Sequence, residues 1–344
     1  MARLTQAIVN LTRLTSLSTR VLADFPFLAT ALVQRPPTYT VPAFSVPSSV
    51  AGYFGGGNDS GSTKQNGIDK IAFPADTKTT LSPTLSSARN QLAGMANSGT
   101  AGYFGGGTDS GLISGIDKIA FPADTKTTLS STLTSARREA AAMANNGVAG
   151  YFGGGFDSTY ISGIDKITFP ADTKTTLSPT LTTARYELAG MADSGTAGYF
   201  GGGGDSAGRL SGIDKVTFPA DTKTTLSPTL SNAVARNAAM ANSGVAGYFG
   251  GGYLGSSSNV IDKITFPADT KTTLLATLIV GNDQLAGMAN SGVAGYFGGG
   301  NDNSGPVNHI DKVTFPADTR TALSAVLTST RAALGGMADS GGVL

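Results

Sequence analysis

The feature that most constrains this chain is one unit that is repeated six times over most of its length. The motif GYFGGG carries a tyrosine in every copy, and these are Tyr53, Tyr103, Tyr151, Tyr199, Tyr248 and Tyr296. Each copy is followed by Ile-Asp-Lys and then by Phe-Pro-Ala-Asp-Thr. Self-similarity at such a regular period indicates a repeat architecture, in which each unit packs against its neighbours.

Turn signals divide each unit into four strand-sized segments. In the second unit, the pattern predicts strands over residues 91–96, 100–106, 116–121 and 126–133. Four antiparallel strands in each unit are typical of a propeller blade. We therefore expect an all-β, six-bladed β-propeller over residues 50–344.

The two ends of the repeat region complement each other. Pro47 and two serines lead directly into the first GYFGGG segment, so the first unit lacks a strand before Val50. The last unit ends with an additional strand-like segment over residues 333–338. We expect this C-terminal strand to complete the first blade, because that pairing closes the ring and removes an exposed sheet edge.

Several positions in the unit resemble the kelch repeat. Tyr53 is followed by Gly56 and Gly57 in a Tyr-x-x-Gly-Gly pattern, an Asp-Thr turn precedes the last strand, and arginine precedes the first strand of four units. The resemblance covers about residues 50–344 and implies a kelch-like propeller, of the glycine-rich type seen in phage and bacterial surface-associated proteins. The chain departs from the kelch pattern in having no tryptophan, whose place is taken by leucines such as Leu81.

Residues 1–49 do not share the repeat. We expect residues 1–34 to form an anchor or oligomerisation segment, helical or extended, and residues 35–49 to form a Pro-rich extended linker. The alternative for the first segment is a helix packed on the side of the propeller. Apolar or small residues recur there at spacings of three and four, with Ala7 and Ser18 completing the pattern. The larger ones are the candidate contacts of the anchor: Leu4, Leu11, Leu14, Val21, Phe25 and Leu28.

Composition excludes several classes of function. The 24 basic residues balance 23 acidic ones, so the chain lacks the excess positive charge that a nucleic-acid partner requires. It contains no cysteine, which excludes disulfides and thiolate metal sites. No apolar run is long enough for a membrane span, and the N-terminus lacks the apolar core of a signal peptide.

Catalytic residue types are also scarce. The chain has one histidine, His309, and two glutamates, Glu139 and Glu187, both near the predicted starts of first strands. A glycosidase-like site would need two acids in an asymmetric pair, and no such cluster is visible in the sequence. We therefore expect no metal site, no cofactor and no enzymatic activity.

The segment between GYFGGG and Ile-Asp-Lys is the part of the unit that varies in length, with 10, 8, 8, 9, 8 and 9 residues. Alternating strand direction places these loops at the same end of the ring as the connections between blades. We expect a binding face there for a glycan or a protein. Its candidate residues are Asp59, Asp109, Asp157, Asp205, Asp302, Arg89, Arg137, Arg185, Arg331, Phe156, Tyr160 and Tyr253.

The alternative interpretation of this pattern is structural. The aspartates would form side-chain-to-backbone turns, and the arginines would cap blade edges. Val234 and Asn282 interrupt the arginine pattern in two units. The Asp-Lys of each Ile-Asp-Lys motif is expected to pair neighbouring blades.

Anchor, linker and propeller in this order favour a non-enzymatic structural or interaction protein. The leading hypothesis is a phage virion or tail-fibre component, located in the virion, in which residues 1–49 bind other virion or assembly proteins and the propeller recognises a host surface. The alternative is a lectin-like propeller at the bacterial surface or secreted from the cell. A homo-oligomer is a further open possibility for its assembly.

Overall fold

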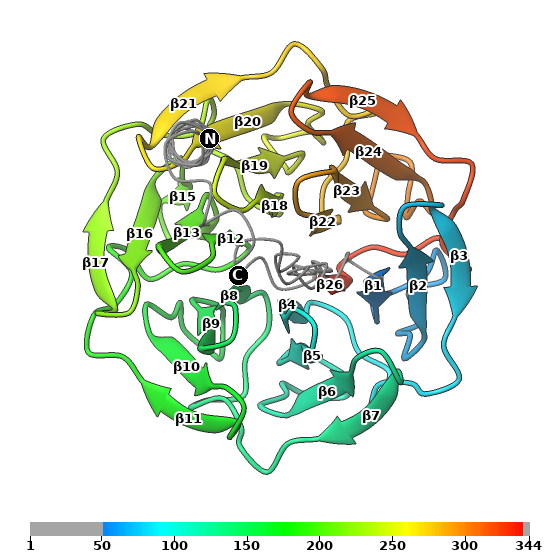
Figure 1. The fold of residues 1–344 in the computed structure, drawn as a ribbon, viewed down its shortest axis with the longest axis horizontal. Coiled ribbons are helices and arrows are strands. Elements are labelled where there is room, and N and C mark those ends of the chain that lie inside the picture. Colours follow the sequence, from blue (N-terminus) through cyan, green and yellow to red (C-terminus); the bar gives the residue numbers. More distant parts are fainter. Residues whose placement is uncertain (1–50, 340–344) are drawn as a thin grey trace, which may run out of the picture. The chain divides into compact units, whose positions relative to one another are not determined.

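The structure is a computed structural model that describes residues 51–339. These residues form six four-stranded antiparallel sheets around a central axis (Figure 1), which confirms the prediction of an all-β, six-bladed propeller. The predicted anchor and linker lie outside the described residues. No helix within residues 51–339 is long and apolar enough to cross a membrane.

We number the blades in the order of their GYFGGG strands and name the four strands of each blade a to d from the axis outward. The a strands are β26 (Gly335–Asp339), β4 (Ala93–Asn97), β8 (Ala141–Asn145), β12 (Ala189–Asp193), β18 (Ala238–Asn242) and β22 (Ala286–Asn290). The b strands are β1 (Ala51–Gly55), β5 (Ala101–Gly105), β9 (Ala149–Gly153), β13 (Ala197–Gly201), β19 (Ala246–Gly250) and β23 (Ala294–Gly298).

The outer half of each blade comes from the second half of the unit. The c strands are β2 (Ile68–Ala72), β6 (Ile116–Ala120), β10 (Ile164–Thr168), β16 (Ile213–Thr217), β20 (Ile261–Thr265) and β24 (Ile310–Thr314). The d strands are β3 (Thr77–Thr80), β7 (Thr125–Thr128), β11 (Thr173–Thr176), β17 (Thr222–Thr225), β21 (Thr270–Thr273) and β25 (Thr319–Ala322). A short hairpin, β14 (Gly204–Asp205) and β15 (Gly208–Arg209), lies in the b–c loop of blade 4.

The d strands are shorter than the sequence predicts. In blade 2, the pairing with β6 ends at Thr128, and the segment predicted as strand up to Leu133 instead leaves the sheet towards the next blade. Leu133 is nevertheless buried, with 2% of its surface exposed. Leu133 is therefore apolar because it packs beneath the connection between blades, and it does not pair in a strand.

Blade 1 is closed by the end of the repeat region, as predicted. Strand β26 pairs antiparallel with β1, with Tyr53 opposite Met337 and Ala51 opposite Asp339. The sheet order β26-β1-β2-β3 therefore joins the last described strand to the first three. Every blade in the described part of the chain therefore has an inner a strand paired with its b strand.

Neighbouring blades interlock where glycine meets a large side chain. A Cβ atom on Gly102 would lie 2.1 Å from the sulfur of Met337 in blade 1, and one on Gly105 would lie 2.6 Å from the ring of Phe152 in blade 3. Both large side chains are buried, with exposed fractions of 2% and 0%. The glycines of the b strands therefore provide the space into which the neighbouring blades pack.

A polar contact also repeats at each blade boundary. The hydroxyl of Tyr103 donates to Asp172 Oδ1 at 2.8 Å, and Lys118 Nζ lies 2.6 Å from Asp172 Oδ2. The Tyr103 ring stacks on Phe169 with 5.1 Å between ring centroids. Burial and the hydrogen bond to Asp172 raise the pKa of Tyr103. The lysine of each Ile-Asp-Lys motif thus pairs with the next blade, as expected.

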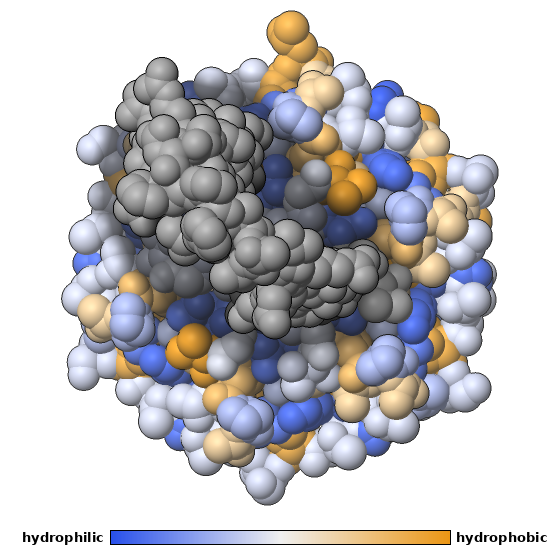
Figure 2. All heavy atoms as spheres, viewed as in Figure 1, coloured by the Kyte–Doolittle hydropathy of each residue, from blue (hydrophilic) through white to orange (hydrophobic). Residues whose placement is uncertain are grey.

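The exposed large apolar side chains of residues 51–339 lie in two kinds of loop. Val148, Val245 and Val293 are in a–b turns, and Leu275, Ile279, Val280 and Val326 are in connections that follow d strands. On the face shown in Figure 2, apolar residues alternate with polar ones over the visible blades. Exposed apolar residues in loops are normal for a protein surface.

Candidate functional site

One end of the ring is built from the b–c loops and the d-to-a connections. In blade 2, the connection residue Asn90 forms a β-bridge with Thr108 of the loop, and in blade 3 Arg138 bridges Phe156. Equivalent bridges occur in the other blades. The two kinds of segment therefore form one surface, which we call the loop face, at the end of the ring predicted from strand direction.

The four predicted arginines do not belong to the exposed part of the loop face. Arg89, Arg137, Arg185 and Arg331 have exposed fractions of 0–3%. Arg89 Nη2 donates to Asp117 Oδ2 at 2.9 Å and to the carbonyl of Phe104 at 3.1 Å. The prediction that these four arginines are exposed binding residues is therefore wrong. Each guanidinium points into the blade and pairs with the aspartate of an Ile-Asp-Lys motif.

That carboxylate holds the connection between two blades. Asp117 Oδ2 also accepts from the backbone N–H of Ser86 at 2.9 Å, and Thr128 donates to Asp117 Oδ1 at 2.7 Å. Burial opposes ionisation of Asp117, but these hydrogen bonds and the charge of Arg89 outweigh it and lower its pKa. Asp69 occupies the same position in blade 1, where it accepts from Thr328 and pairs with Arg331.

Blades 5 and 6 lack this arginine, and the structure shows the consequence. Beside Val234, a cavity of about 20 Å³ is lined by Asn237, Ser258 and Asp262 among others. In blade 6, Asn282 Nδ2 donates to the carbonyl of Gly299 at 2.6 Å rather than to the buried carboxylate. Burial therefore raises the pKa of Asp311, with only partial compensation from the backbone N–H of Ile279.

The five predicted loop aspartates organise their own loops. Asp59 Oδ1 accepts from the backbone N–H groups of Gly61 and Thr63 at 3.0 and 2.9 Å, and Asp205 Oδ1 accepts from Ala207 and Gly208 at 2.8 and 3.0 Å. The same kind of bond is made by Asp109, Asp157 and Asp302. These contacts are Asx turns, which fix loop shape whether or not a ligand binds.

The predicted aromatic residues gather on neighbouring blades. Phe156 and Tyr160 of blade 3 pack against Tyr186, with centroid distances of 6.2 and 5.2 Å. The guanidinium of Arg138 lies 5.2 Å from the centroid of the Phe156 ring. All of these side chains are partly exposed. They form the first of two aromatic clusters on the loop face.

The second cluster surrounds Tyr253 of blade 5. The guanidinium carbons of Arg209 and Arg236 lie 5.5 and 5.4 Å from the centroid of its ring. Arg209 is exposed, whereas Tyr253 and Arg236 are partly buried. Tyr186, Arg209 and Arg236 were missed by sequence reasoning, although each differs from its equivalents in the other repeats, and that difference was the available signal.

A closed ring of backbone hydrogen bonds surrounds the axis at the loop face. It is formed by the residues at one equivalent position of each repeat, which we call the axial ring: Gln91, Glu139, Glu187, Arg236, Gln284 and Ala333. All six have φ between +55° and +61°. Each N–H donates to the carbonyl of the preceding member at 2.7–3.0 Å, and Gln91 closes the circle by donating to Ala333.

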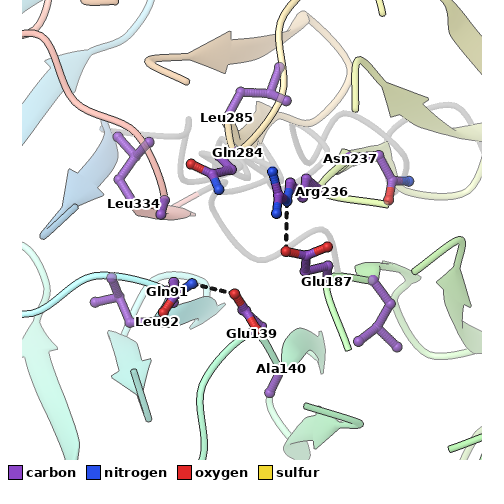
Figure 3. Close-up of a pocket in the computed structure, with 12 residues that line it drawn as sticks. Gln91, Leu92, Glu139, Ala140, Glu187, Arg236, Asn237, Gln284, Leu285 and Leu334 are labelled. Carbon is purple, nitrogen blue, oxygen red and sulfur yellow. Dashed lines mark hydrogen bonds and ion pairs between the residues drawn. The ribbon is translucent and has the colours of Figure 1, made fainter. Parts of the chain in front are cut away.

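The side chains of the axial ring are not alike, because they comprise two glutamines, two glutamates, one arginine and one alanine. They line a pocket of about 80 Å³ at the axis, shown in Figure 3. Arg236 Nε donates to Glu187 Oε1 at 2.6 Å, and Gln91 Nε2 donates to Glu139 Oε1. Both glutamate side chains are buried, with exposed fractions of 8% for Glu139 and 7% for Glu187.

The carboxyl of Glu139 is the most strongly perturbed acid of the pocket. Burial, followed by the negative charge of Glu187, raises its pKa to about 7, although Arg138, Arg236 and the hydrogen bond from Gln91 act in the opposite direction. The expectation that no asymmetric acidic cluster exists is corrected here. The two glutamates lie in adjacent repeats, and closure of the ring brings both to the axis.

The described residues do not offer a metal site. Within residues 51–339, no group of three or more His, Cys, Asp or Glu side chains is arranged to hold a metal ion. The loop aspartates lie on separate loops and are engaged in turns, and calcium requires six or more oxygen ligands.

Fold and loop face together define the class of this protein: a six-bladed β-propeller whose differences between repeats are concentrated at one end of the ring. No protein-family model matches the chain, and no curated protein is significantly similar to it in sequence.

Proposed function

We propose that this protein is a non-enzymatic recognition protein that binds a glycan or a surface protein through the loop face of blades 3 to 5. The observation that carries the proposal is the gathering of partly exposed aromatic rings and guanidinium groups around Tyr160, Tyr186 and Tyr253. Aromatic rings offer contact area at a low cost in side-chain entropy, and arginine adds directed hydrogen bonds.

The scaffold supports this role because it is rigid beneath the clusters. Asp157 fixes the loop of Phe156 by accepting from backbone N–H groups, and β-bridges join Phe156 and Tyr253 to the connections between blades. A preorganised surface loses less conformational entropy on binding. The absence of sixfold symmetry at the loop face also favours one binding orientation for an asymmetric ligand.

We further propose that the propeller is of the glycine-rich kelch-like type and that it serves as a phage virion or tail-fibre component. In this proposal, residues 1–49 attach the chain to the particle and the loop face is displayed. The order of anchor-like segment, Pro-rich linker and propeller in the sequence supports it. A lectin-like propeller at a bacterial surface is the second candidate, and it would use the same loop face.

Array binding of the full chain tests the recognition role. We expect that Phe156→Ala combined with Tyr160→Ala weakens binding to a captured glycan or surface protein at least tenfold. The matched control is Thr108→Ala combined with Leu112→Ala, which alters the equivalent loop positions of blade 2. Equal affinity of both double variants would refute the assignment to blades 3 to 5.

The proposed location has a separate test. Particles assembled without this chain should lose adsorption or stability, and particles that are unchanged in both properties would refute a virion role.

A further inference from the structure

Glu139 presents a buried oxygen without a partner at the centre of the axial ring. Its Oε1 accepts from Gln91 and lies 3.6 Å from Arg138 Nη1, whereas its Oε2 is inaccessible to solvent and has no hydrogen-bond partner. In Figure 3 the Glu139 and Glu187 carboxyl groups reach into the same pocket from adjacent blades. A buried polar atom that lacks a partner is costly, so it marks a place for a donor.

The charges around this oxygen define the missing donor. Glu139 and Glu187 bring two carboxylates to the pocket, but only Arg236 of the axial ring is cationic. Arg236 donates to Glu187 and lies over Tyr253, and Arg138 lies over Phe156 at the rim. Neither arginine forms a hydrogen bond with Glu139 Oε2.

The shape of the pocket limits the size of the cation. Its space of about 80 Å³ accommodates a few water-sized groups but not a bulky ion. Its wall includes the apolar side chains of Leu92, Leu188, Leu285 and Leu334. A chain of methylene groups can pack against such a wall while its charged end reaches a polar partner.

We propose that the axial pocket binds a primary alkylammonium group, such as the side chain of a lysine presented by a partner protein. The ammonium donates to Glu139 Oε2 once the carboxyl group turns that buried oxygen into the pocket, and its methylene stem packs against the leucines of the wall. An ammonium has three donors and no acceptor, which matches a pocket with an excess of acceptors. This site is additional to the aromatic clusters and does not depend on the ligand that they bind.

Thermal unfolding of the full chain with n-butylammonium chloride tests the site. At pH 8 and constant ionic strength, a concentration ten times the dissociation constant should raise Tm by about 2 °C. Glu139→Gln should abolish this rise, and Asp205→Asn, which alters a loop aspartate of the same face, should preserve it. Tetramethylammonium, which has no donor, should have no effect.

A second variant makes the test independent of how well Glu139→Gln folds. Ala333→Lys places a tethered ammonium on the axial ring, so it should raise Tm by itself and remove the response to n-butylammonium. An equal response of the wild type and both variants would overturn the proposal. A response to glucosamine but not to n-butylammonium would overturn the choice of an alkylammonium ligand.

The same proteins separate this proposal from the proposed function. If array binding depends on Tyr160 while n-butylammonium has no effect, the axial site fails and surface recognition stands. If n-butylammonium binds through Glu139 but no surface ligand is captured, the axial site stands and surface recognition fails.

Discussion

The buried carboxyl of Glu139 should make this propeller less stable as the pH rises towards neutrality. Its pKa is raised from 4.5 to about 7, mainly by burial and then by the charge of Glu187. Between these two pH values the folded state binds more protons than the unfolded state, so the free energy of unfolding falls as pH increases. Each pK unit is worth about 1.4 kcal/mol, which gives a loss of about 3 kcal/mol above pH 7.

Glu139→Gln isolates this contribution. The amide keeps the volume of the side chain and can still accept a hydrogen bond from Gln91, but it carries no charge. At pH 4.5 the variant and the wild type should be equally stable. At pH 8 the variant should be more stable by about 3 kcal/mol, which corresponds to a Tm higher by about 6 °C for a domain of this size.

Denaturant unfolding and thermal melting between pH 4 and pH 8 measure the effect. Asp69, Asp117 and Asp214 have lowered pKa values, so their stabilisation is lost only as pH falls below about 4, outside this window. Asp205→Asn on the same face is the control and should run parallel to the wild type. A stability difference between Glu139→Gln and wild type that stays constant with pH would refute the reasoning.

Three further predictions concern the ring itself. Arg331→Met leaves Asp69 buried without its guanidinium partner, and we expect a loss of about 3 kcal/mol in denaturant unfolding; a loss below about 0.5 kcal/mol would contradict a structural role for the pair. Val234→Arg should fill the cavity beside Val234 and form an ion pair with Asp262. We expect its free energy of unfolding to exceed that of Val234→Met, which fills the cavity without charge, by about 1 kcal/mol. Equal stability of the two variants would show that the charge adds nothing. Deletion of residues 332–344 removes β26 and opens blade 1, so the whole ring should melt at a lower temperature in calorimetry, and an unchanged Tm would mean that closure does not stabilise it.

Much of the architecture was predictable because the same strand and turn motifs occur six times in the sequence. The GYFGGG and Phe-Pro-Ala-Asp-Thr segments predicted the b strands and the c–d turns, and the additional segment after residue 332 predicted closure. Strand alternation also placed the loops and connections at one end. The outer boundary of the d strands was less predictable, since Leu133 is apolar for packing and not for pairing.

The repeat, the number of blades and the closure of the ring follow from the residues alone, because periodicity and turn chemistry are local properties. The partners of the arginines and of the axial glutamates depend on how the blades pack. The arginine side chains point into the blades because each buried aspartate of an Ile-Asp-Lys motif needs a cationic partner. Glu139 and Glu187 lie together at the axis, since equivalent positions of successive repeats become neighbours only when the blades are arranged around a common centre.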